Sequence, residues 1–298
     1  MPRVLLITNP AAARHDPDVV GAVSSALGAE GWEVDVAGTT KGGDAGRLAA
    51  QGVADGVNVI AVYGGDGTTM QAVGGMVGAG IPLALIPGGT GNLLAGNLRL
   101  PRDPVEAARL VAGGKPRRVD VGQVERPDGV RYFAVNCGAG IDAQIMEGTT
   151  AAAKRRWGMA AYVAEAWDVL TGVRSVPYRV TVDAQTLDVE AVTVLVANCG
   201  EVGPLYFSLG HGIALDDGWL DVVVLRAEGI TGSLATIWEL FRQPANGSGR
   251  VLRARGKSIT VECQLDRPVQ MDGELAGRTP FSTKVVAGAI EVLVPSRL

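Results

Sequence analysis

Two glycine-rich turns constrain what this 298-residue chain can fold into more than any other feature. The run GGDGT at residues 64–68 follows the apolar segment Val57–Val62, and the run PGGTGN at residues 87–92 follows the apolar segment Leu83–Ile86. A short apolar run that ends in glycines and leads into a helical pattern is typical of a buried parallel strand. Because parallel strands end at the same edge of a sheet, we expect both turns to line one crevice.

Strand and helix signals alternate through the first third of the chain. Asp16-Pro17 and Asp103-Pro104 are typical helix starts, in which an N-cap residue is followed by proline. After about Arg118 the chain consists mainly of short apolar runs separated by turn residues, which indicates antiparallel β structure. The expected parallel strands are Val4–Ile7, Trp32–Val36, Val57–Val62 and Leu83–Ile86.

These patterns predict two domains. Residues 1–120 should form an α/β domain with an open, mostly parallel sheet, and residues 121–298 a mainly antiparallel β-sandwich. A cleft between two such domains is the expected place for an active site.

Composition and cysteine usage exclude several classes of function. The formal net charge of −4 gives no general attraction to polyanions, so we expect no nucleic-acid partner. The three cysteines, Cys137, Cys199 and Cys263, show no CxxC spacing and fit no paired disulfide framework. The N-terminal apolar run Val4–Ile7 is too short for a signal peptide. These features predict a cytoplasmic protein.

The segment Gly67–Leu98 carries no charged residue, and its 32 residues would be long enough to cross a membrane. However, nine glycines, two prolines and several polar side chains interrupt it. We therefore expect a buried α/β layer here and no transmembrane segment.

Asp66 lies in the first glycine-rich turn, where its carboxylate can serve phosphate chemistry. Glycines there let the backbone approach a phosphate, and the free N–H groups at the start of the next helix attract anions. Asp66 would then hold magnesium or an acceptor hydroxyl beside the phosphates. In isolation the same run is an ordinary turn in which Asp66 caps the helix. The second glycine-rich turn on the neighbouring strand favours the nucleotide site.

Other phosphate-binding and catalytic motifs fail on spacing or context. Neither Gly-Lys pair, at residues 114–115 and 256–257, has the preceding glycine that a Walker A loop needs. The run GAGIDA at residues 138–143 matches a dinucleotide-binding pattern, but Glu165, at the expected distance, falls in a helical pattern. The sequence contains no GxSxG and no HExxH motif.

Two acidic pairs in the second half are further candidates. Asp272 and Glu274 lie two residues apart around a glycine, and paired carboxylates can accept a hydroxyl proton or bind a metal. Asp216 and Asp217 also precede a glycine. Since Asp-Gly is a strong hairpin signal, each pair is equally compatible with a polar turn.

Taken together, these motifs resemble the bacterial diacylglycerol kinase and sphingosine kinase-like lipid kinases from Val4 to about Pro295. GGDGT is also found in NAD kinases and resembles the phosphofructokinase loop, so the later runs are the more specific ones. The resemblance implies a NAD kinase or phosphofructokinase-like first domain and a second domain that supplies metal and catalytic residues. The runs that carry it are VYGGDGTT, IPGGTGNLLAGNL, VDVGQV, RYFAVNCGAGIDAQI, KRRWGMAAYV, ALDDGWLDVVVL and VQMDGE.

The resemblance also implies roles for individual residues. Glu274 would accept a proton, with Asp272 as its rival. A structural Mg²⁺ would be held by Asp217 with the backbone carbonyls of Ala214 and Trp219, since oxygen ligands suit magnesium. The residues that would contact ATP are Asn9, Thr39, Gly65, Asp66, Gly67, Thr68 and Thr90.

This chain departs from the family pattern at five positions near the expected nucleotide. Ala12 and Ala13 stand where the family usually has serine and glycine, Met70 and Gln71 replace an asparagine and a glutamate, and Leu93 replaces an aspartate. These replacements bear on nucleotide affinity and on the acceptor more than on the type of reaction.

The sequence thus predicts transfer of the γ-phosphoryl group of ATP to a hydroxyl of diacylglycerol or a related lipid. Reaching a lipid requires contact with a membrane surface, for which Lys154–Trp157 is a candidate patch, although an exposed basic helix start has the same composition. Two alternatives stay open: a NAD kinase-like enzyme, and a nucleotide-binding regulator without catalysis. The acceptor, the pathway and the oligomeric state, including a homodimer, also stay open.

Overall fold

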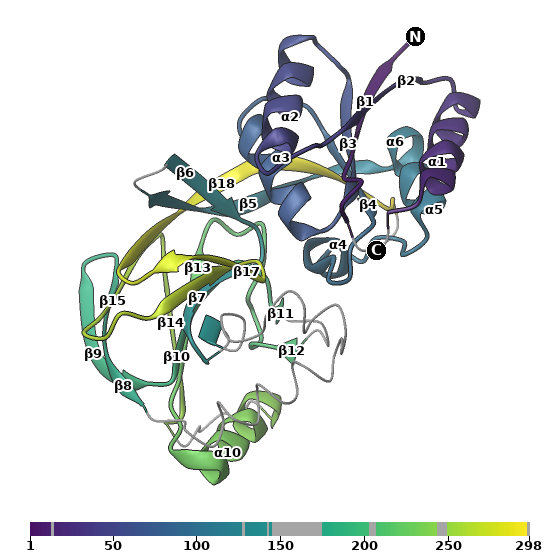
Figure 1. The fold of residues 1–298 in the computed structure, drawn as a ribbon. Helices are drawn as coiled ribbons and strands as arrows, with labels where there is room; N and C mark the ends of the chain where they lie inside the picture. Colours follow the sequence, from purple (N-terminus) through teal and green to yellow (C-terminus); the bar gives the residue numbers. More distant parts are fainter. Residues whose placement is uncertain are drawn as a thin grey trace.

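The computed structural model describes residues 1–12, 15–126, 129–141, 143–144, 175–202, 207–242 and 249–296. Figure 1 shows an α/β body that contains the N-terminus and a second body built mainly of strands. Both predicted layer types, the mostly parallel α/β sheet and the mainly antiparallel β-sandwich, are confirmed.

The first body is built on a parallel sheet in the order β2-β1-β3-β4. β3 pairs in parallel with β1 and β4, and its register places Gly64 beside Pro87, so the two strands end at the same level. The observed β3 runs to the first glycine of the GGDGT turn, two residues beyond the predicted end. The strands are β1 (Arg3–Thr8), β2 (Glu33–Gly38), β3 (Val59–Gly64) and β4 (Leu83–Pro87).

Helices cover both faces of this sheet (Figure 1). α1, α5 and α6 pack on one face, and α2 and α3 pack on the other. The predicted helix starts are confirmed, because Asp16 accepts a hydrogen bond from the amide of Asp18 and Asp103 accepts one from the amide of Val105. The helices are α1 (Pro17–Ala29), α2 (Asp44–Ala54), α3 (Asp66–Met76), α4 (Leu93–Asn97), α5 (Pro104–Ala108) and α6 (Leu110–Gly113).

The charge-free segment Gly67–Leu98 folds as α3, β4 and α4, as the sequence predicted. Among the residues that the structure describes, no helix has the length and apolar character needed to cross a membrane.

The second body is a sandwich of two sheets with a hydrophobic core between them. One sheet is wholly antiparallel, in the order β14-β13-β10-β7-β16-β17. β7 lies antiparallel between β10 and β16, so the GAGIDA run lacks the parallel strand that a dinucleotide-binding fingerprint requires. The strands of this sheet are β7 (Asn136–Gly140), β10 (Thr193–Ala197), β13 (Leu220–Leu225), β14 (Val251–Gly256), β16 (Pro268–Met271) and β17 (Glu274–Arg278).

The remaining strands form the opposing sheet and a small ribbon. The opposing sheet contains β5 (Lys115–Arg126), β6 (Gly129–Phe133), β8 (Val176–Val182), β9 (Gln185–Ala191), β15 (Ser258–Cys263) and β18 (Phe281–Val294). The ribbon joins β11 (Glu201–Val202) to β12 (Phe207–Ser208), and one helix, α10, spans Gly229–Arg242.

The long strand β18 connects the two bodies (Figure 1). It pairs with β15 and β5 in the sandwich, and its end at Val292 pairs in parallel with Leu83 of β4. The C-terminal strand therefore completes the sheet of the first body. The predicted division at residue 120 falls inside β5, the antiparallel partner of β18, and stays a prediction.

Candidate active site

The two glycine-rich turns lie against each other at the carboxyl ends of β3 and β4. A Cβ atom on Gly89 would lie only 2.6 Å from the Cα atom of Gly65, so the contact between the turns is backbone to backbone. The amide of Gly88 also donates a hydrogen bond to the carbonyl of Gly64 at 2.9 Å. The two turns thus meet at one edge of the sheet, and glycine is required at the point of closest approach.

The second turn holds the carboxylate of Asp66. Oδ1 of Asp66 accepts a hydrogen bond of 2.7 Å from the amide of Leu93, and a Cβ atom on Gly91 would lie 2.7 Å from Oδ2. Burial raises the pKa of Asp66, while the amides of residues 92–94 lower it. Leu93, which replaces a family aspartate, thus contributes its backbone N–H to the site.

Asn92 shapes this second turn, although the sequence analysis gave it no role. It has a left-handed backbone with φ of 49°, and its side chain binds both the amide and the carbonyl of Gly89 at 3.0 and 2.7 Å. Asparagine tolerates this conformation better than most residues, so Asn after Gly91 was a usable signal.

The other predicted nucleotide contacts end neighbouring strands of the same sheet. Asn9 follows β1, and its side-chain nitrogen donates to Oγ1 of Thr68 at 2.8 Å. Thr39 follows β2, and its amide donates to the carbonyl of Thr8 at 2.9 Å. Thr90 is exposed at the tip of the second turn. All seven predicted residues therefore lie at one edge of the sheet, where α/β proteins bind ligands.

Glu274 reaches this edge from the second body. It is the first residue of β17, and it is exposed. Its carboxylate lies against Gly67, in the space that a side chain at position 67 would occupy. The structure thus brings one carboxylate of the predicted acidic pair to the start of α3. Gly67, which this carboxylate contacts, directly follows Asp66 in the chain.

Asp272, the other member of the pair, points into the protein. Its Oδ2 accepts a hydrogen bond from the amide of Ala134 at 2.8 Å, and its Oδ1 accepts from the amides of Val135 and Asn136 at 2.9 Å each. Burial raises the pKa of Asp272 to about 7, even though the three amide donors act to lower it. With φ of 48°, Asp272 also forms the turn between β16 and β17 together with Gly273. Its contacts are those of an anchor for the hairpin that carries Glu274.

We expect Asp272→Asn to destabilise the fold. An amide nitrogen in place of one carboxylate oxygen cannot accept from a backbone N–H, and a buried unsatisfied donor costs about 1–3 kcal/mol. A thermal melt should show a midpoint lowered by several degrees, whereas Glu274→Gln, at an exposed position two residues away, should melt like wild type. A wild-type melt for Asp272→Asn would show that these three hydrogen bonds do not anchor the hairpin.

A cleft of about 580 Å³ opens beside Glu274. One face of α3 lines the cleft with Gly67, Gln71 and Gly74, which lie on the same side of the helix. Gly67 and Gly74 have no side chains, which leaves room beside the helix. Oε1 of Gln71 accepts a hydrogen bond of 2.8 Å from the amide of Gly43, which ties α3 to the start of α2. Gln71, a departure from the family pattern, therefore has a definite structural contact.

The walls of the cleft are both apolar and basic. Val130 and Leu275 are exposed hydrophobic residues of the β5–β6 and β16–β17 hairpins, and both line the cleft. Arg47 and Arg131 line it as well. The carboxyl residues Asp272 and Glu274 line it too, so the cleft combines apolar, basic and acidic residues.

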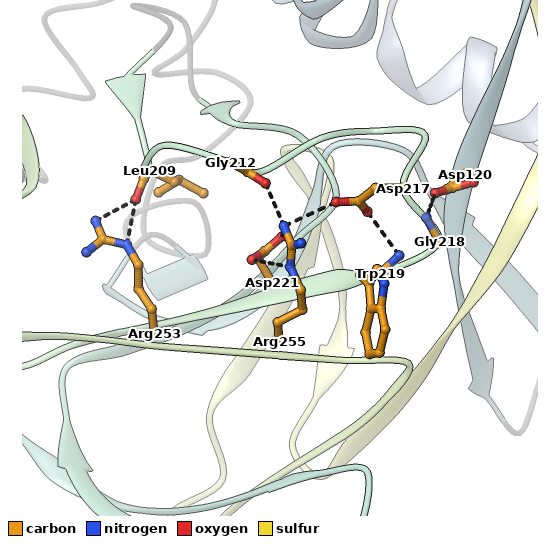
Figure 2. Close-up of polar contacts among 9 residues, drawn as sticks. All are labelled: Asp120, Leu209, Gly212, Asp217, Gly218, Trp219, Asp221, Arg253 and Arg255. Atoms are coloured by element: carbon orange, nitrogen blue, oxygen red, sulfur yellow. Dashed lines mark hydrogen bonds and ion pairs between the residues drawn. The ribbon is translucent and has the colours of Figure 1, made fainter.

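The metal prediction for Ala214, Asp217 and Trp219 concerns a connection away from this cleft. Figure 2 shows that Oδ1 of Asp217 accepts from the amide of Trp219 at 3.1 Å and that Oδ2 lies 3.2 Å from a guanidinium nitrogen of Arg255. A divalent cation on this carboxylate would face a fixed positive charge, so the residues present do not fit one. Within the described part of the chain, no cluster of three or more His, Cys, Asp or Glu side chains suits a metal. The prediction itself stays untested.

The structure does not describe two further parts of the chain that the sequence analysis singled out. The candidate membrane patch Lys154–Trp157 and Ala13 both lie outside the described residues.

Comparisons with known proteins agree with this architecture. The family model of the diacylglycerol kinase catalytic domain matches residues 3–124, and that of the YegS C-terminal NAD kinase beta sandwich-like domain matches residues 135–294. A crystal structure of a diacylglycerol kinase from Bacillus anthracis str. Sterne has a TM-score of 0.76 at 25% identity over 99% of this chain and 97% of that one. A second structure from this organism has a TM-score of 0.81 at 26% identity over 99% and 95% of the two chains.

Curated relatives match over most of their length. The diacylglycerol kinase of Mycobacterium tuberculosis (strain CDC 1551 / Oshkosh) is 29% identical over 85% of this chain and 82% of that protein. The probable lipid kinase YegS-like of Stenotrophomonas maltophilia (strain K279a) is 28% identical over 99% and 97% of the two chains. Since the second family model alone covers more than half of the sequence and both models match in order, the chain belongs to the family of diacylglycerol kinases and YegS-like lipid kinases.

Proposed function

We propose that this protein transfers the γ-phosphoryl group of ATP to a hydroxyl of diacylglycerol or a related lipid. The observation that supports the proposal best is the position of Glu274, whose carboxylate lies against Gly67 at the mouth of an apolar and basic cleft. A proton acceptor, a phosphate-binding edge and a surface for an amphiphile meet there.

The proposed division of labour follows from the geometry. The glycine-rich turns would supply backbone N–H groups for the phosphates, and the partly buried carboxylate of Asp66 lies at the same edge. Magnesium, bound with the nucleotide, would neutralise charge on the phosphates, as in phosphoryl transfer generally. In this proposal the residues of this edge would hold the nucleotide with its terminal phosphate toward Glu274.

The reaction that this arrangement supports is a direct transfer. The acceptor hydroxyl loses its proton to the carboxylate of Glu274 as its oxygen forms a bond to the γ-phosphorus. The bond between the γ-phosphorus and the β–γ bridging oxygen breaks, and ADP leaves with the electron pair. A positioned carboxylate is a general base of ordinary strength, so most of the acceleration must come from positioning and electrostatics.

The cleft is the proposed acceptor site. Exposed Val130 and Leu275 would contact the apolar part of the lipid, and Arg47 and Arg131 its polar part. Such a substrate lies in a membrane. We therefore propose that this protein is cytoplasmic and binds the membrane surface reversibly.

ADP release measured against a panel of acceptors tests this proposal. Purified protein with ATP and magnesium should release ADP with vesicles that contain diacylglycerol or a related lipid alcohol and show no such stimulation by NAD. Stimulation by NAD alone would identify a NAD kinase-like enzyme. Nucleotide binding without turnover on any acceptor would identify a regulator.

The contact between Gly67 and Glu274 yields a further prediction. We expect Gly67→Ala to lower kcat by about 10- to 100-fold, because the added methyl group displaces the carboxylate and misplacement of about 1 Å costs up to ~10²-fold. The melting midpoint of Gly67→Ala should equal that of wild type or rise slightly, since alanine favours a helix over glycine by about 1 kcal/mol.

Gly21→Ala is the matched control, because Gly21 lies in α1 and a Cβ atom there would meet nothing within 4 Å. Kinetics and thermal melts of both variants check the prediction. Equal activity of the two variants would contradict the proposed position of Glu274 during turnover.

A further inference from the structure

Two arginines of β14 hold the connection that runs from β12 to β13 (Figure 2). Arg253 donates to the carbonyl of Leu209 from Nε at 3.2 Å and from Nη2 at 2.8 Å. Arg255 donates from Nη2 to the carbonyl of Gly212 at 2.5 Å. Residues two apart on a strand point to the same face, so the pair acts on one stretch of the connection.

Arg255 also binds two carboxylates. Its Nε and Nη2 contact both oxygens of Asp221 at 3.1 Å each, and its Nη2 lies 3.2 Å from Oδ2 of Asp217. Asp221 faces Arg255 directly in the β13–β14 register, so the backbone pairing itself places this bidentate contact. The side chains of Asp217 and Asp221 are only 26% and 17% exposed, which makes an uncompensated charge on either of them costly.

The oxygens gathered around Arg255 are those that a hard metal ion would take. Two carboxylates and a backbone carbonyl form a typical oxygen ligand set for magnesium or calcium. A guanidinium offers five N–H donors in a fixed plane with a permanent positive charge, and it binds carboxylates in pairs. One side chain can therefore neutralise and connect the same groups without a metal.

Asp120 of β5 links this connection to the opposing sheet of the sandwich. The amide of Gly218 donates to Oδ2 of Asp120 at 2.6 Å, and the amide of Gly288 in β18 donates to its Oδ1 at 2.6 Å. The shape of the connection is thus coupled to β5 and to β18, the strand that connects the two bodies.

We propose that Arg255 is the structural cation of this connection and takes the place of a divalent metal ion at Asp217. The stability of the nucleotide-free protein is then independent of magnesium and calcium. Removal of the guanidinium leaves Asp217, Asp221 and the carbonyl of Gly212 as an open oxygen site, so the variant gains a divalent dependence that the wild-type protein lacks. This inference does not rest on the proposed kinase activity.

Thermal melts without nucleotide, in EDTA and in millimolar magnesium or calcium chloride, test the proposal. The wild-type midpoint should be the same in all three conditions. Arg255→Met keeps the aliphatic stem and should melt about 3–10 °C lower in EDTA, and magnesium or calcium should restore part of that loss by binding the native state.

Arg179→Met is the matched control, because Arg179 forms a comparable two-bond pair with Asp188 at 2.8 and 3.2 Å on the β8–β9 hairpin, where both side chains are more than half exposed. Its melt should not respond to divalent ions. A wild-type midpoint that falls in EDTA, or an Arg255→Met protein whose melt ignores divalent ions, overturns the proposal.

Arg255→Lys covers the case in which Arg255→Met does not fold. Lysine keeps the charge but cannot bind Asp221 in the paired geometry, so this variant should lose a smaller part of the stability and show no divalent response. A divalent-dependent melt of Arg255→Lys, together with a chelator-sensitive wild type, would assign the site to a metal ion. Because no nucleotide is present, these results stand whether or not the protein phosphorylates a lipid.

Discussion

Asp66→Asn abolishes turnover and leaves the fold intact: this is the largest effect that we expect. Asparagine keeps the oxygen that accepts from the amide of Leu93 but removes the charge that faces the phosphate edge. Loss of one preorganised electrostatic group costs about 10²- to 10³-fold in kcat, and loss of a group that also organises the metal should cost more. Steady-state kinetics should therefore show at least about a 10³-fold loss.

The stability of the Asp66→Asn variant should move in the opposite direction. Burial raises the pKa of Asp66, so the native fold holds the ionised carboxylate at an energetic cost near neutral pH. A neutral amide removes that cost, and the melting midpoint should equal or exceed that of wild type.

Asp103→Asn is the matched control, because Asp103 caps α5 and asparagine caps a helix about as well as aspartate. Both its activity and its stability should stay near wild type. Full turnover in Asp66→Asn would remove Asp66 from the mechanism.

Glu274→Gln should reduce kcat by about 10²- to 10⁴-fold with little change in the KM for ATP. A general base typically contributes a factor of this size, and glutamine keeps the shape of the side chain but cannot take a proton. The proposed nucleotide contacts all lie in the other body, so ground-state binding of ATP should persist. Glu125→Gln, at an exposed residue of β5 that pairs with Lys284, is the matched control and should keep full activity.

Asp272 is the rival base, and the structure separates the two roles. Loss of activity in Asp272→Asn should come with a lower melting midpoint, because the residue anchors the hairpin through three backbone amides. If Asp272→Asn is inactive but melts like wild type, while Glu274→Gln stays active, the base is Asp272.

Local composition was enough to predict the two glycine-rich turns at the edge of the parallel sheet. Glycines after buried strands predicted the turns at residues 64–68 and 87–92, because few residues other than glycine allow such close backbone approach. Asp-Pro pairs predicted the starts of α1 and α5 for similar local reasons. Turns and helix starts depend on residues that are adjacent in the chain, so a single sequence is enough to predict them.

Features that depend on distant pairing were not predictable. Asp272 and Glu274 are almost adjacent in sequence, yet one is buried against residues 134–136 and the other contacts Gly67. Their separation depends on the registers of β16 with β7 and with β17, which no local pattern encodes. The same holds for β18, which pairs Val292 with Leu83 of β4 across more than two thirds of the chain.

The role of Arg255 could not be predicted from the sequence, because its neighbours along the chain do not reveal which groups it binds. Arg253 and Arg255 alternate along β14, which indicates a common face, but the connection that they bind lies more than 40 residues earlier. Only the β13–β14 register reveals that Asp221 stands opposite Arg255.

A radioactive label on the γ-phosphate of ATP shows whether this group reaches a lipid. Purified protein is incubated with γ-labelled ATP, magnesium and vesicles that contain diacylglycerol and related lipid alcohols, and the organic extract is then analysed for labelled lipid. We expect a labelled lipid phosphate with the wild-type protein and about 10²- to 10⁴-fold slower labelling with Glu274→Gln. Label that stays entirely in the aqueous phase with every lipid, from a protein that melts cooperatively and binds ATP, would contradict the proposed function.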